Sequence, residues 1–407
     1  MISYFDNNAT TAVTPSVVDA MLPYMREHYG NPSSPHAMAR TPALAVKKAR
    51  EQVAGLWSVP SSSLVFTSGG TESNAMAIHA ALAARPERRE VVFSAVEHAA
   101  VWGWRARLEK KGHTINIAPV NRDGALDLDQ LASLITERTA LVCLMLANNE
   151  TGVVYPVHEV AKLTREVGAW LHTDAVQAAG KIPFQGGDIE GMSAVTESGH
   201  GLPDGIITAM SPLGAGVDSA AICGHKFHAI KGIGALFIRD TAGFSPLLLG
   251  GEQEGGLRPG TEAVPSIVSL GAAAAEATEW LKGGGADEMR TRRDGFEDWL
   301  LEMFPDAIIA GKNQPRLPNT TLAIFPGIET EPLLALLDMA GVACSSGSAC
   351  ASGAHEPSHV LAAMGLDQPQ PAAVIRISSS RFTTDEDYAR LREALRHAVT
   401  KLRVATR

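Results

Sequence analysis

The sequence contains few cysteines and few aromatic residues for its length. Only four of its 407 residues are cysteine, and phenylalanine, tyrosine and tryptophan together make up 5%. Four cysteines in a chain of this length do not form the disulfide framework of a small secreted scaffold. We therefore expect the protein to work in the reducing cytoplasm, with its cysteines free for chemistry.

The sequence also lacks a long apolar run and an excess of positive charge. Its longest clean apolar run, 141–147, is far too short to cross a membrane, and its first residues show no signal-peptide pattern. Lysine and arginine number 35 against 44 aspartates and glutamates, which gives a net charge of −9. We therefore expect neither a membrane nor a nucleic acid as partner, although backbone donors can still bind a small anion.

What the sequence does contain is a regular alternation of apolar segments. Hydrophobic residues make up 45% of the chain, and Thr14-Pro15 opens a helix that we expect to end near Gly30. Further helical stretches alternate with apolar runs of strand length at 63–68, 90–95, 139–146, 169–174 and 232–240. Near-continuous apolar strands between helices predict an α/β fold, in which helices sandwich a mainly parallel sheet.

The alternation stops after residue 240, which predicts a second domain. An alanine-rich helical stretch at 266–282 is followed by three glycines, so we expect the domain boundary between 258 and 285. The predicted large domain covers residues 13–260. Residues 261–407, together with 1–12, form the predicted smaller α+β domain.

Two charged residues stand at the ends of predicted strands. Lys226 follows a short apolar strand in ICGHKFHAIKGIG, and Asp174 ends the run at 169–174. A lysine there can form a Schiff base with a carbonyl cofactor, and an aspartate can keep a pyridine nitrogen protonated. In open α/β sheets, ligands bind beyond the carboxyl ends of the strands, which suits both residues. Taken alone, each has an ordinary alternative: a solvated loop lysine and a helix-capping aspartate.

A glycine-rich turn, a histidine and an arginine add further polar groups. The turn at 67–72 can offer backbone N–H groups to a phosphate, although an ordinary tight turn has the same pattern. His98 follows a predicted strand and can stack on a flat ring or move protons. Arg376 lies in a strand-like stretch and can pair with a carboxylate. A structural histidine and a surface ion pair are the alternatives for these two residues.

Cys350 lies in a stretch of small residues that lacks an apolar anchor. The run 344–353 reads CSSGSACASG, which is typical of a mobile loop where a cysteine is open to chemistry. We therefore predict that Cys350 is a nucleophile. The nearby Cys344, His355 and His359 match no common zinc spacing with it, so we predict no metal site.

Together these segments resemble the cysteine desulfurases, most closely the nitrogen-fixation or NifS-type branch. Between FDNNATT (5–11) and RFTTDED (381–387), the motifs that carry the resemblance occur in the family's order: YGNPSSPH, TSGGTESN, VEHAAV, ANNETG, HTDAVQAAGK, CGHK, RPGTE and SSGSACASG. The resemblance implies the type I fold of transferases that depend on pyridoxal 5′-phosphate (PLP), with a seven-stranded sheet. It also implies a reaction that removes sulfur from L-cysteine and gives L-alanine.

The resemblance assigns the central chemical roles. Lys226 would carry PLP, Asp174 would pair with its pyridine nitrogen, and Gln177 would pair with its phenolic oxygen. His98 would stack on the ring and shuttle protons. Cys350 would take the sulfur as a persulfide and deliver it elsewhere.

The resemblance also assigns residues to the phosphate of PLP and to the substrate. Gly70, Thr71 and His225 would hold the phosphate, next to Cys223, and Thr261 would reach it from the partner subunit of a homodimer. The remaining residues would lie beside the substrate: Asn149 next to both cofactor and substrate, with Arg376 and Asn31 clamping the substrate carboxylate.

The resemblance implies a sulfur-acceptor or iron–sulfur scaffold protein as partner, but it does not name that partner. Nitrogenase cluster assembly is the usual destination in this branch, while general iron–sulfur cluster assembly and tRNA thiolation are alternatives. Other functions also stay open. The chain could be a selenocysteine lyase or another PLP enzyme of the same fold, such as an aminotransferase, or an inactive docking platform for a sulfur acceptor.

One segment departs from the family. Residues 185–216 contain eight glycines, and their only charges are acidic: Asp188, Glu190, Glu197 and Asp204. A docking or gating loop that selects a basic acceptor is one interpretation, and a tolerated surface insertion is the other.

Overall fold

The computed structural model describes residues 2–185, 209–347, 358–367 and 372–405. Cys350 and most of the acidic segment predicted at 185–216 lie outside these residues, so the predictions made for them are not addressed by the fold. Within the described part of the chain, no helix is both long and apolar enough to cross a membrane.

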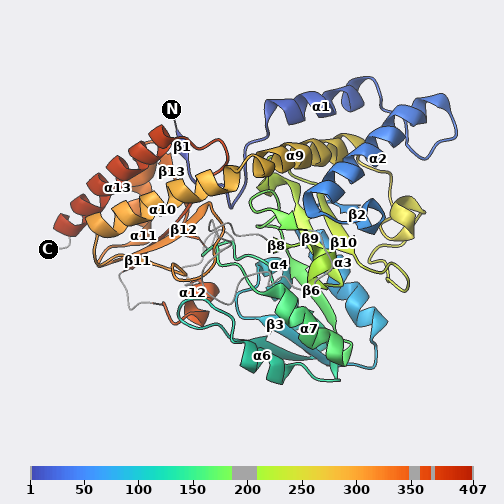
Figure 1. Cartoon of the computed structure of the whole chain (residues 1–407), viewed down its shortest axis with the longest axis horizontal. Coiled ribbons are helices and arrows are strands. Elements are labelled where there is room, and N and C mark those ends of the chain that lie inside the picture. The colour runs from blue at the N-terminus through green and yellow to red at the C-terminus, as the bar shows by residue number, and fades with distance from the viewer. Residues whose placement is uncertain (1, 186–208, 348–357, 368–371, 406–407) are drawn as a thin grey trace.

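A seven-stranded sheet forms the centre of the larger part of the molecule (Figure 1). Its strands, in spatial order, are β2 (Leu64–Thr67), β10 (Gly234–Ile238), β9 (Ser219–Cys223), β6 (Trp170–Asp174), β5 (Thr139–Cys143), β3 (Glu90–Ser94) and β4 (Thr114–Ala118). Neighbouring strands run parallel except for β10, which is antiparallel to both β2 and β9. The prediction of a mainly parallel sheet is therefore confirmed.

Helices cover both faces of this sheet, because side chains that alternate along each strand point to opposite sides. On β3, Val92 packs with α2 and α9 in one apolar cluster, whereas Val91 and Phe93 pack with α3 in another. The helices of this part of the chain are α1 (Pro15–Arg26), α2 (Ala37–Trp57), α3 (Gly70–Ala84), α4 (Ala99–Trp102), α5 (Arg105–Lys110), α6 (Leu128–Leu134), α7 (Val157–Val167), α8 (Pro212–Ala215) and α9 (Val264–Lys282). A short parallel pair, β7 (Phe184–Gln185) and β8 (Ala209–Met210), lies beside the sheet.

The first helix begins where the sequence predicts but ends earlier. Thr14 caps α1 by accepting a hydrogen bond from the backbone N–H of Val17, and Pro15 takes the first helical position. The helix ends at Arg26 rather than near Gly30, so that part of the prediction was wrong. The backbone N–H groups of residues 27 and 28 both bond to the carbonyl of residue 23, which closes the last turn early.

A smaller three-stranded antiparallel sheet lies at the other end of the molecule (Figure 1). Its strands are β11 (Ile308–Ile309), β12 (Thr320–Pro326) and β14 (Ala372–Ser378), and the helices of this part are α10 (Gly285–Met303), α11 (Thr330–Met339), α12 (His359–Ala363) and α13 (Asp385–Ala405). The N-terminal strand β1 (Ser3–Tyr4) pairs in parallel with β13 (Val342–Ala343). The first residues of the chain therefore lie with its C-terminal part.

The position of α9 bears on the division into two domains. This helix packs along α1 and α2 (Figure 1), and Gly283 and Gly284 separate it from α10. We propose a boundary at these two glycines, inside the window 258–285 expected from the sequence. This boundary lies later than residue 260.

Candidate active site

A cavity of about 670 Å³ lies between the two sheets, next to the carboxyl ends of β3, β6 and β9. Its lining includes ten of the residues predicted for the site: Gly70, Thr71, His98, Asn149, Asp174, Gln177, Cys223, His225, Lys226 and Arg376. Asn31 and Thr261 are exposed and do not line it within this chain. Cys350 lies outside the described residues.

Lys226 ends a short 3₁₀ turn (Gly224–Lys226) that follows β9, and its amine points to the N-terminal segment of the chain. Its Nζ donates to the backbone carbonyls of Asn8 and Ala9, each at 2.7 Å. Burial is the main cause that lowers the pKa of Lys226 to about 8. A lysine in this state is partly neutral near pH 7.5 and can act as a nucleophile.

Asp174 ends β6 and is fixed through both of its carboxylate oxygens. Its Oδ1 accepts from the backbone N–H of Val176 at 3.0 Å, and its Oδ2 accepts from Asn74 Nδ2 at 2.7 Å. Both donors orient the carboxylate at the edge of the cavity.

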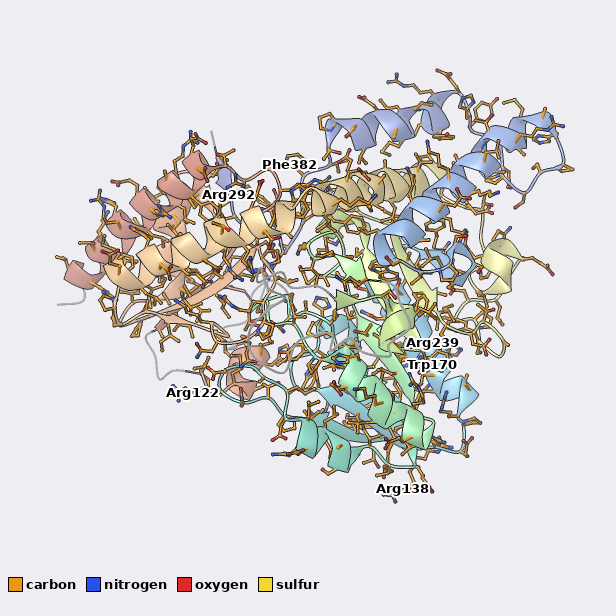
Figure 2. The ribbon with its side chains drawn as sticks, in the orientation of Figure 1. Arg122, Arg138, Trp170, Arg239, Arg292 and Phe382 are labelled. Atoms are coloured by element: carbon orange, nitrogen blue, oxygen red, sulfur yellow. The ribbon has the colours of Figure 1, made fainter. Side chains whose placement is uncertain are left out.

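A chain of buried hydrogen bonds leads from Trp170 to Asp174, and the type of each group sets its direction. Trp170 Nε1 can only donate, and it donates to Ser219 Oγ at 2.9 Å. The Ser219 hydroxyl donates to His172 Nδ1 at 2.9 Å, because a neutral ring that carries its proton on Nε2 can only accept on Nδ1. His172 Nε2 then donates to Asn74 Oδ1 at 2.7 Å. Burial lowers the pKa of His172 to about 4, so the ring is neutral and carries one proton, as this chain requires. Trp170, which is labelled in Figure 2, is the first residue of β6.

His98 caps the short helix α4 through its side chain. Its Nδ1 accepts from the backbone N–H of Ala100 at 3.1 Å, and burial lowers the pKa of His98. A neutral His98 therefore carries its proton on Nε2, as a donor.

The neighbouring Glu97 is wholly buried. Its Oε1 accepts from Ser94 Oγ and from the backbone N–H of Met145, while its Oε2 has no partner among the described residues.

Gln177 is held in one orientation by two neighbours. The carbonyl of Asn8 can only accept, so Gln177 Nε2 faces it at 3.0 Å, and Gln177 Oε1 accepts from Lys181 Nζ at 2.6 Å. Lys181 also donates to Asn8 Oδ1 at 2.9 Å, and burial lowers the pKa of Lys181 well below its usual range. The second N–H of Gln177 Nε2 therefore remains available at the cavity.

The N-terminus of α3 has the features of an anion site. No side chain caps this helix, and Gly69 before it has a φ of 153°. A Cβ on Gly70 would stand only 2.8 Å from Val176 Cγ2, so the turn needs glycine at this position. Backbone N–H groups of the first turn thus come close to the cavity, beside Thr71. Burial lowers the pKa of the nearby His225 to about 4, which keeps its ring neutral.

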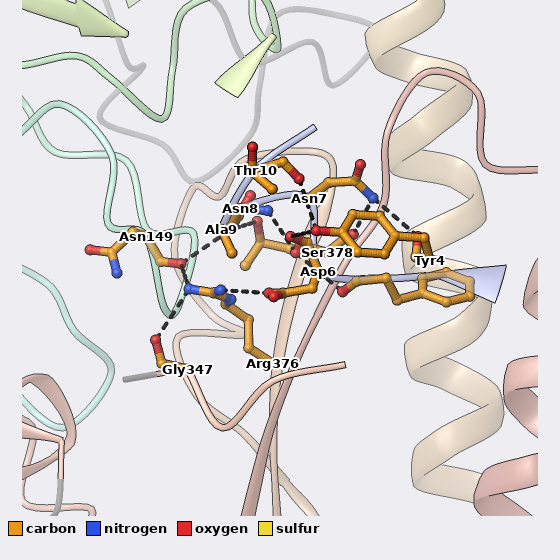
Figure 3. Close-up of polar contacts among 12 residues, drawn as sticks. Tyr4, Asp6, Asn7, Asn8, Ala9, Thr10, Asn149, Gly347, Arg376 and Ser378 are labelled. Atoms are coloured by element: carbon orange, nitrogen blue, oxygen red, sulfur yellow. Dashed lines mark hydrogen bonds and ion pairs between the residues drawn. The ribbon is translucent and has the colours of Figure 1, made fainter. Parts of the chain in front are cut away.

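Arg376 projects from β14 into the opposite side of the cavity (Figure 3). Its Nη1 donates to the backbone carbonyls of Asn149 and Gly347 at 3.0 and 3.2 Å, and its Nη2 donates to Asp6 Oδ1 at 2.8 Å. Its buried Nε has no hydrogen-bond partner among the described residues. A buried guanidinium with unused N–H groups can take up a further carboxylate oxygen.

The sequence reasoning missed the N-terminal segment, although FDNNATT was among the quoted motifs. Asn8 contacts Lys226, Gln177 and Asn149, and Asp6 contacts Arg376. The run of one aspartate and two asparagines at 6–8 was the available signal, because such side chains readily hydrogen-bond to backbone groups.

His359 also lines the cavity, in a place that the sequence did not predict. Its Nε2 bonds to the carbonyl of Glu97 at 3.0 Å, and its ring stacks on Trp102 with ring centres 5.4 Å apart. The adjacent Ser358 donates to Glu150 Oε2 at 2.6 Å and caps α12. These contacts anchor α12 to α4 and to the chain around Glu97 and Glu150.

Comparison with known proteins agrees with this arrangement. A family model described as aminotransferase class V matches residues 3–202 and 210–391. A cysteine desulfurase of Nostoc sp. is 46% identical over 99% of this chain and 94% of its own length. The cysteine desulfurase NifS of Azotobacter vinelandii is 42% identical over 98% of this chain and 93% of its own length.

Solved structures are similar over the same length. A structure described as a NifS-like protein has a TM-score of 0.85 and 34% identity, and the match covers 99% of this chain and 100% of that one. A structure described as SspA in complex with cysteine has a TM-score of 0.75 and 28% identity, over 94% of this chain and 99% of that one. By sequence and by fold, the chain belongs to the aminotransferase class-V family of PLP-dependent enzymes, and within it to the cysteine desulfurases.

Proposed function

We propose that this protein binds PLP at Lys226 and transfers the sulfur of L-cysteine to Cys350, with L-alanine as the other product. The observation that carries this proposal is the single cavity into which Lys226, Asp174, His98 and Arg376 all project. Membership of the family indicates the type of reaction, and the residues that line the cavity include a suitable chemical group for each step of it.

The residues present fit PLP. The uncapped N-terminus of α3 suits the phosphate, the oriented Asp174 side chain suits a protonated pyridine nitrogen, and the free N–H of Gln177 suits the phenolic oxygen. PLP, when bound, supplies an electron sink for the bonding electrons of the substrate's Cα–H bond. Lys226 can reach the same space, because it lines the cavity with them.

The amine of Lys226 acts as nucleophile and as carrier of a proton. Its pKa of about 8 leaves part of it neutral at neutral pH, which the attack on a carbonyl requires. Whenever its amine is free, Lys226 would donate to the carbonyls of Asn8 and Ala9, which hold the amine at the cavity. Lys226 is then positioned to exchange a proton with the substrate.

His98 is set up to give a proton before it takes one. Its Nδ1 is engaged by the backbone of α4, so the proton on Nε2 is the one that it can donate. Burial lowers the pKa of His98 and keeps the ring neutral between transfers. A neutral ring is also suited to stacking on a flat cofactor.

Arg376 would bind the substrate carboxylate through the N–H of Nη2 that Asp6 does not use. The Cys350 thiolate would then attack the substrate sulfur. The carbon–sulfur bond breaks as the new sulfur–sulfur bond forms, and the carbon takes a proton to give L-alanine. The persulfide on Cys350 would next pass to an acceptor protein.

We further propose that the enzyme is a cytoplasmic homodimer that supplies iron–sulfur cluster assembly. Thr261 is exposed in this chain, as it must be to reach the phosphate of a partner subunit, and Asn31 is exposed as well. The similarity to the NifS of Azotobacter vinelandii supports a nitrogenase-related destination for the sulfur.

The purified enzyme should convert L-cysteine to L-alanine and release sulfide in the presence of a small thiol. Cys350→Ala should keep the visible absorbance of PLP but lose nearly all sulfide formation. Cys344→Ala is the matched control and should keep most of the activity, because burial raises the pKa of the Cys344 thiol and keeps it protonated.

Two results would contradict this assignment. If Cys344→Ala lost the activity and Cys350→Ala kept it, the nucleophile would be misassigned. Borohydride reduction and peptide mapping should place the pyridoxyl group on Lys226, and a label on Lys181 would refute the proposed cofactor site.

A further inference from the structure

The surroundings of Arg376 contain a carboxylate before any substrate arrives. The Arg376 side chain is 1% exposed, and Asp6 Oδ1 lies 2.8 Å from its Nη2 (Figure 3). Its other hydrogen-bond acceptors are neutral backbone carbonyls, those of Asn149 and Gly347. Among the described residues, Asp6 is therefore the acidic side chain that directly pairs with this buried cation.

Asp6 cannot easily move away from the arginine. Its backbone carbonyl accepts from the N–H of Ala9 at 3.0 Å and from the hydroxyl of Tyr4 at 3.1 Å. Its backbone also forms a bridge with Ser378 on β14, two residues from Arg376 in the same strand. The turn that carries Asp6 is thus held to the strand that carries Arg376.

The number of donors on Arg376 limits what a substrate can take. A guanidinium has five N–H groups, of which protein acceptors use three here. The Nε–H, which is buried, and one N–H of Nη2 remain. A carboxylate that accepts from the remaining N–H of Nη2 would share this nitrogen with Asp6, so two negative charges would lie within a few ångström of each other.

We propose that Asp6 is a specificity residue, a fixed anion that weakens the binding of amino-acid carboxylates at Arg376, and most strongly of amino acids with a second carboxylate. This inference rests on the proposed function of Arg376. Like charges at such a separation repel each other in a partly buried site. When no substrate is bound, Asp6 balances the positive charge of the buried Arg376 and so stabilises the empty site. The same carboxylate disfavours a tightly bound anionic ligand.

The test is the dissociation constant of L-alanine and of L-aspartate for the PLP-loaded enzyme, measured by calorimetry. Asp6→Asn keeps an acceptor for Nη2 but removes the charge. It should lower the dissociation constant of L-alanine by about tenfold, and that of L-aspartate by more. Thermal unfolding should occur at a lower temperature, because Arg376 loses its counter-ion.

Two further variants make the result decisive. Asp6→Ser removes the same charge with a smaller side chain and should act in the same direction. Asp385→Asn is the matched control: Asp385 pairs with the more exposed Arg292 at 3.0 Å, on helices of the smaller part of the molecule, and its loss should leave both dissociation constants unchanged (Figure 2).

Unchanged or weaker binding of L-alanine by Asp6→Asn would overturn the inference, because Asp6 would then only orient Arg376. An equal gain for L-alanine and L-aspartate would overturn the discrimination between them. Arg376→Ala separates this failure from that of the proposed function. If this variant binds L-alanine as well as the parent does, the carboxylate site itself is misassigned.

Discussion

Glu97 is a wholly buried carboxyl group directly before His98 in the chain. Burial raises the pKa of Glu97 to about 7, although Ser94 and the backbone of Met145 donate to its Oε1. Below pH 4.5 the side chain is protonated in both the folded and the unfolded state, so it adds no penalty. As the pH rises through 7, the folded state loses up to roughly 3 kcal/mol relative to the unfolded state.

Glu97→Gln should remove this dependence on pH. The free energy of unfolding of the variant, relative to that of the parent, should rise by up to roughly 3 kcal/mol between pH 5 and pH 8.5. Urea unfolding of the PLP-free protein measures it. For Glu109→Gln, which alters an exposed pair with Arg105, the free energy of unfolding relative to the parent should not change with pH. If this quantity did not change with pH for Glu97→Gln either, burial would impose no free-energy cost on ionised Glu97.

At the residue scale, the sequence predicted the groups at strand ends better than the groups that contact them. Lys226 and Asp174 line one cavity because the carboxyl ends of neighbouring parallel strands meet at one edge of the sheet. Asp6 and Asn8 precede the first strand of this sheet by more than fifty residues. The adjacent asparagines indicate that this segment makes hydrogen bonds, but its place in the cavity depends on the path of the chain, which a local pattern does not give.

At the scale of elements, β6 positions Asp174 through the buried chain that begins at Trp170. Because each member of the chain donates in one direction only, the loss of His172 interrupts it. Asn74 would then lack the donor to its Oδ1, and its hold on Asp174 would weaken. A buried acceptor without a partner costs about 1–3 kcal/mol.

His172→Phe should therefore weaken PLP binding by the PLP-free protein by roughly tenfold, as measured by fluorescence titration. His172→Gln, which can still donate and accept, should recover much of this loss. Trp170→Phe is the control, because it removes only the donor to Ser219 Oγ, at the end of the chain farthest from Asp174. Equal affinity of His172→Phe and the parent would show that Asp174 needs no such support.

The strands themselves were largely predictable, whereas their direction and ends were not. The apolar run at 139–146 gave β5, yet the strand ends at Cys143. Beyond it the backbone N–H of Met145 bonds to the Glu97 side chain, while residues 144 and 146 still bond to the carbonyls of residues 172 and 174. The sequence also did not predict that β10 runs antiparallel to its neighbours. A strand buried on both faces has the same apolar run in either direction.

At the scale of the whole molecule, large apolar side chains are exposed on neighbouring surface segments. They lie on α1, on α2, between these helices, and just before a turn at 253–256: Met25, Tyr29, Met38, Leu44, Leu248 and Leu249. An ion pair of 2.5 Å between Arg50 and Glu254 holds that turn against α2. Exposed apolar side chains gathered in this way are typical of a protein–protein interface.

This surface is where we expect the second subunit of the proposed homodimer. Leu249 is 90% exposed, so Leu249→Asp should leave the fold intact but shift the protein from dimer to monomer in sedimentation velocity. The monomer should also bind PLP less tightly, because Thr261 could no longer reach the phosphate of a partner. Met339→Asp, at a side chain 83% exposed on α11, should remain dimeric. A dimeric Leu249→Asp with unchanged PLP affinity would move the interface elsewhere, and the exposure of Thr261 would then need another explanation.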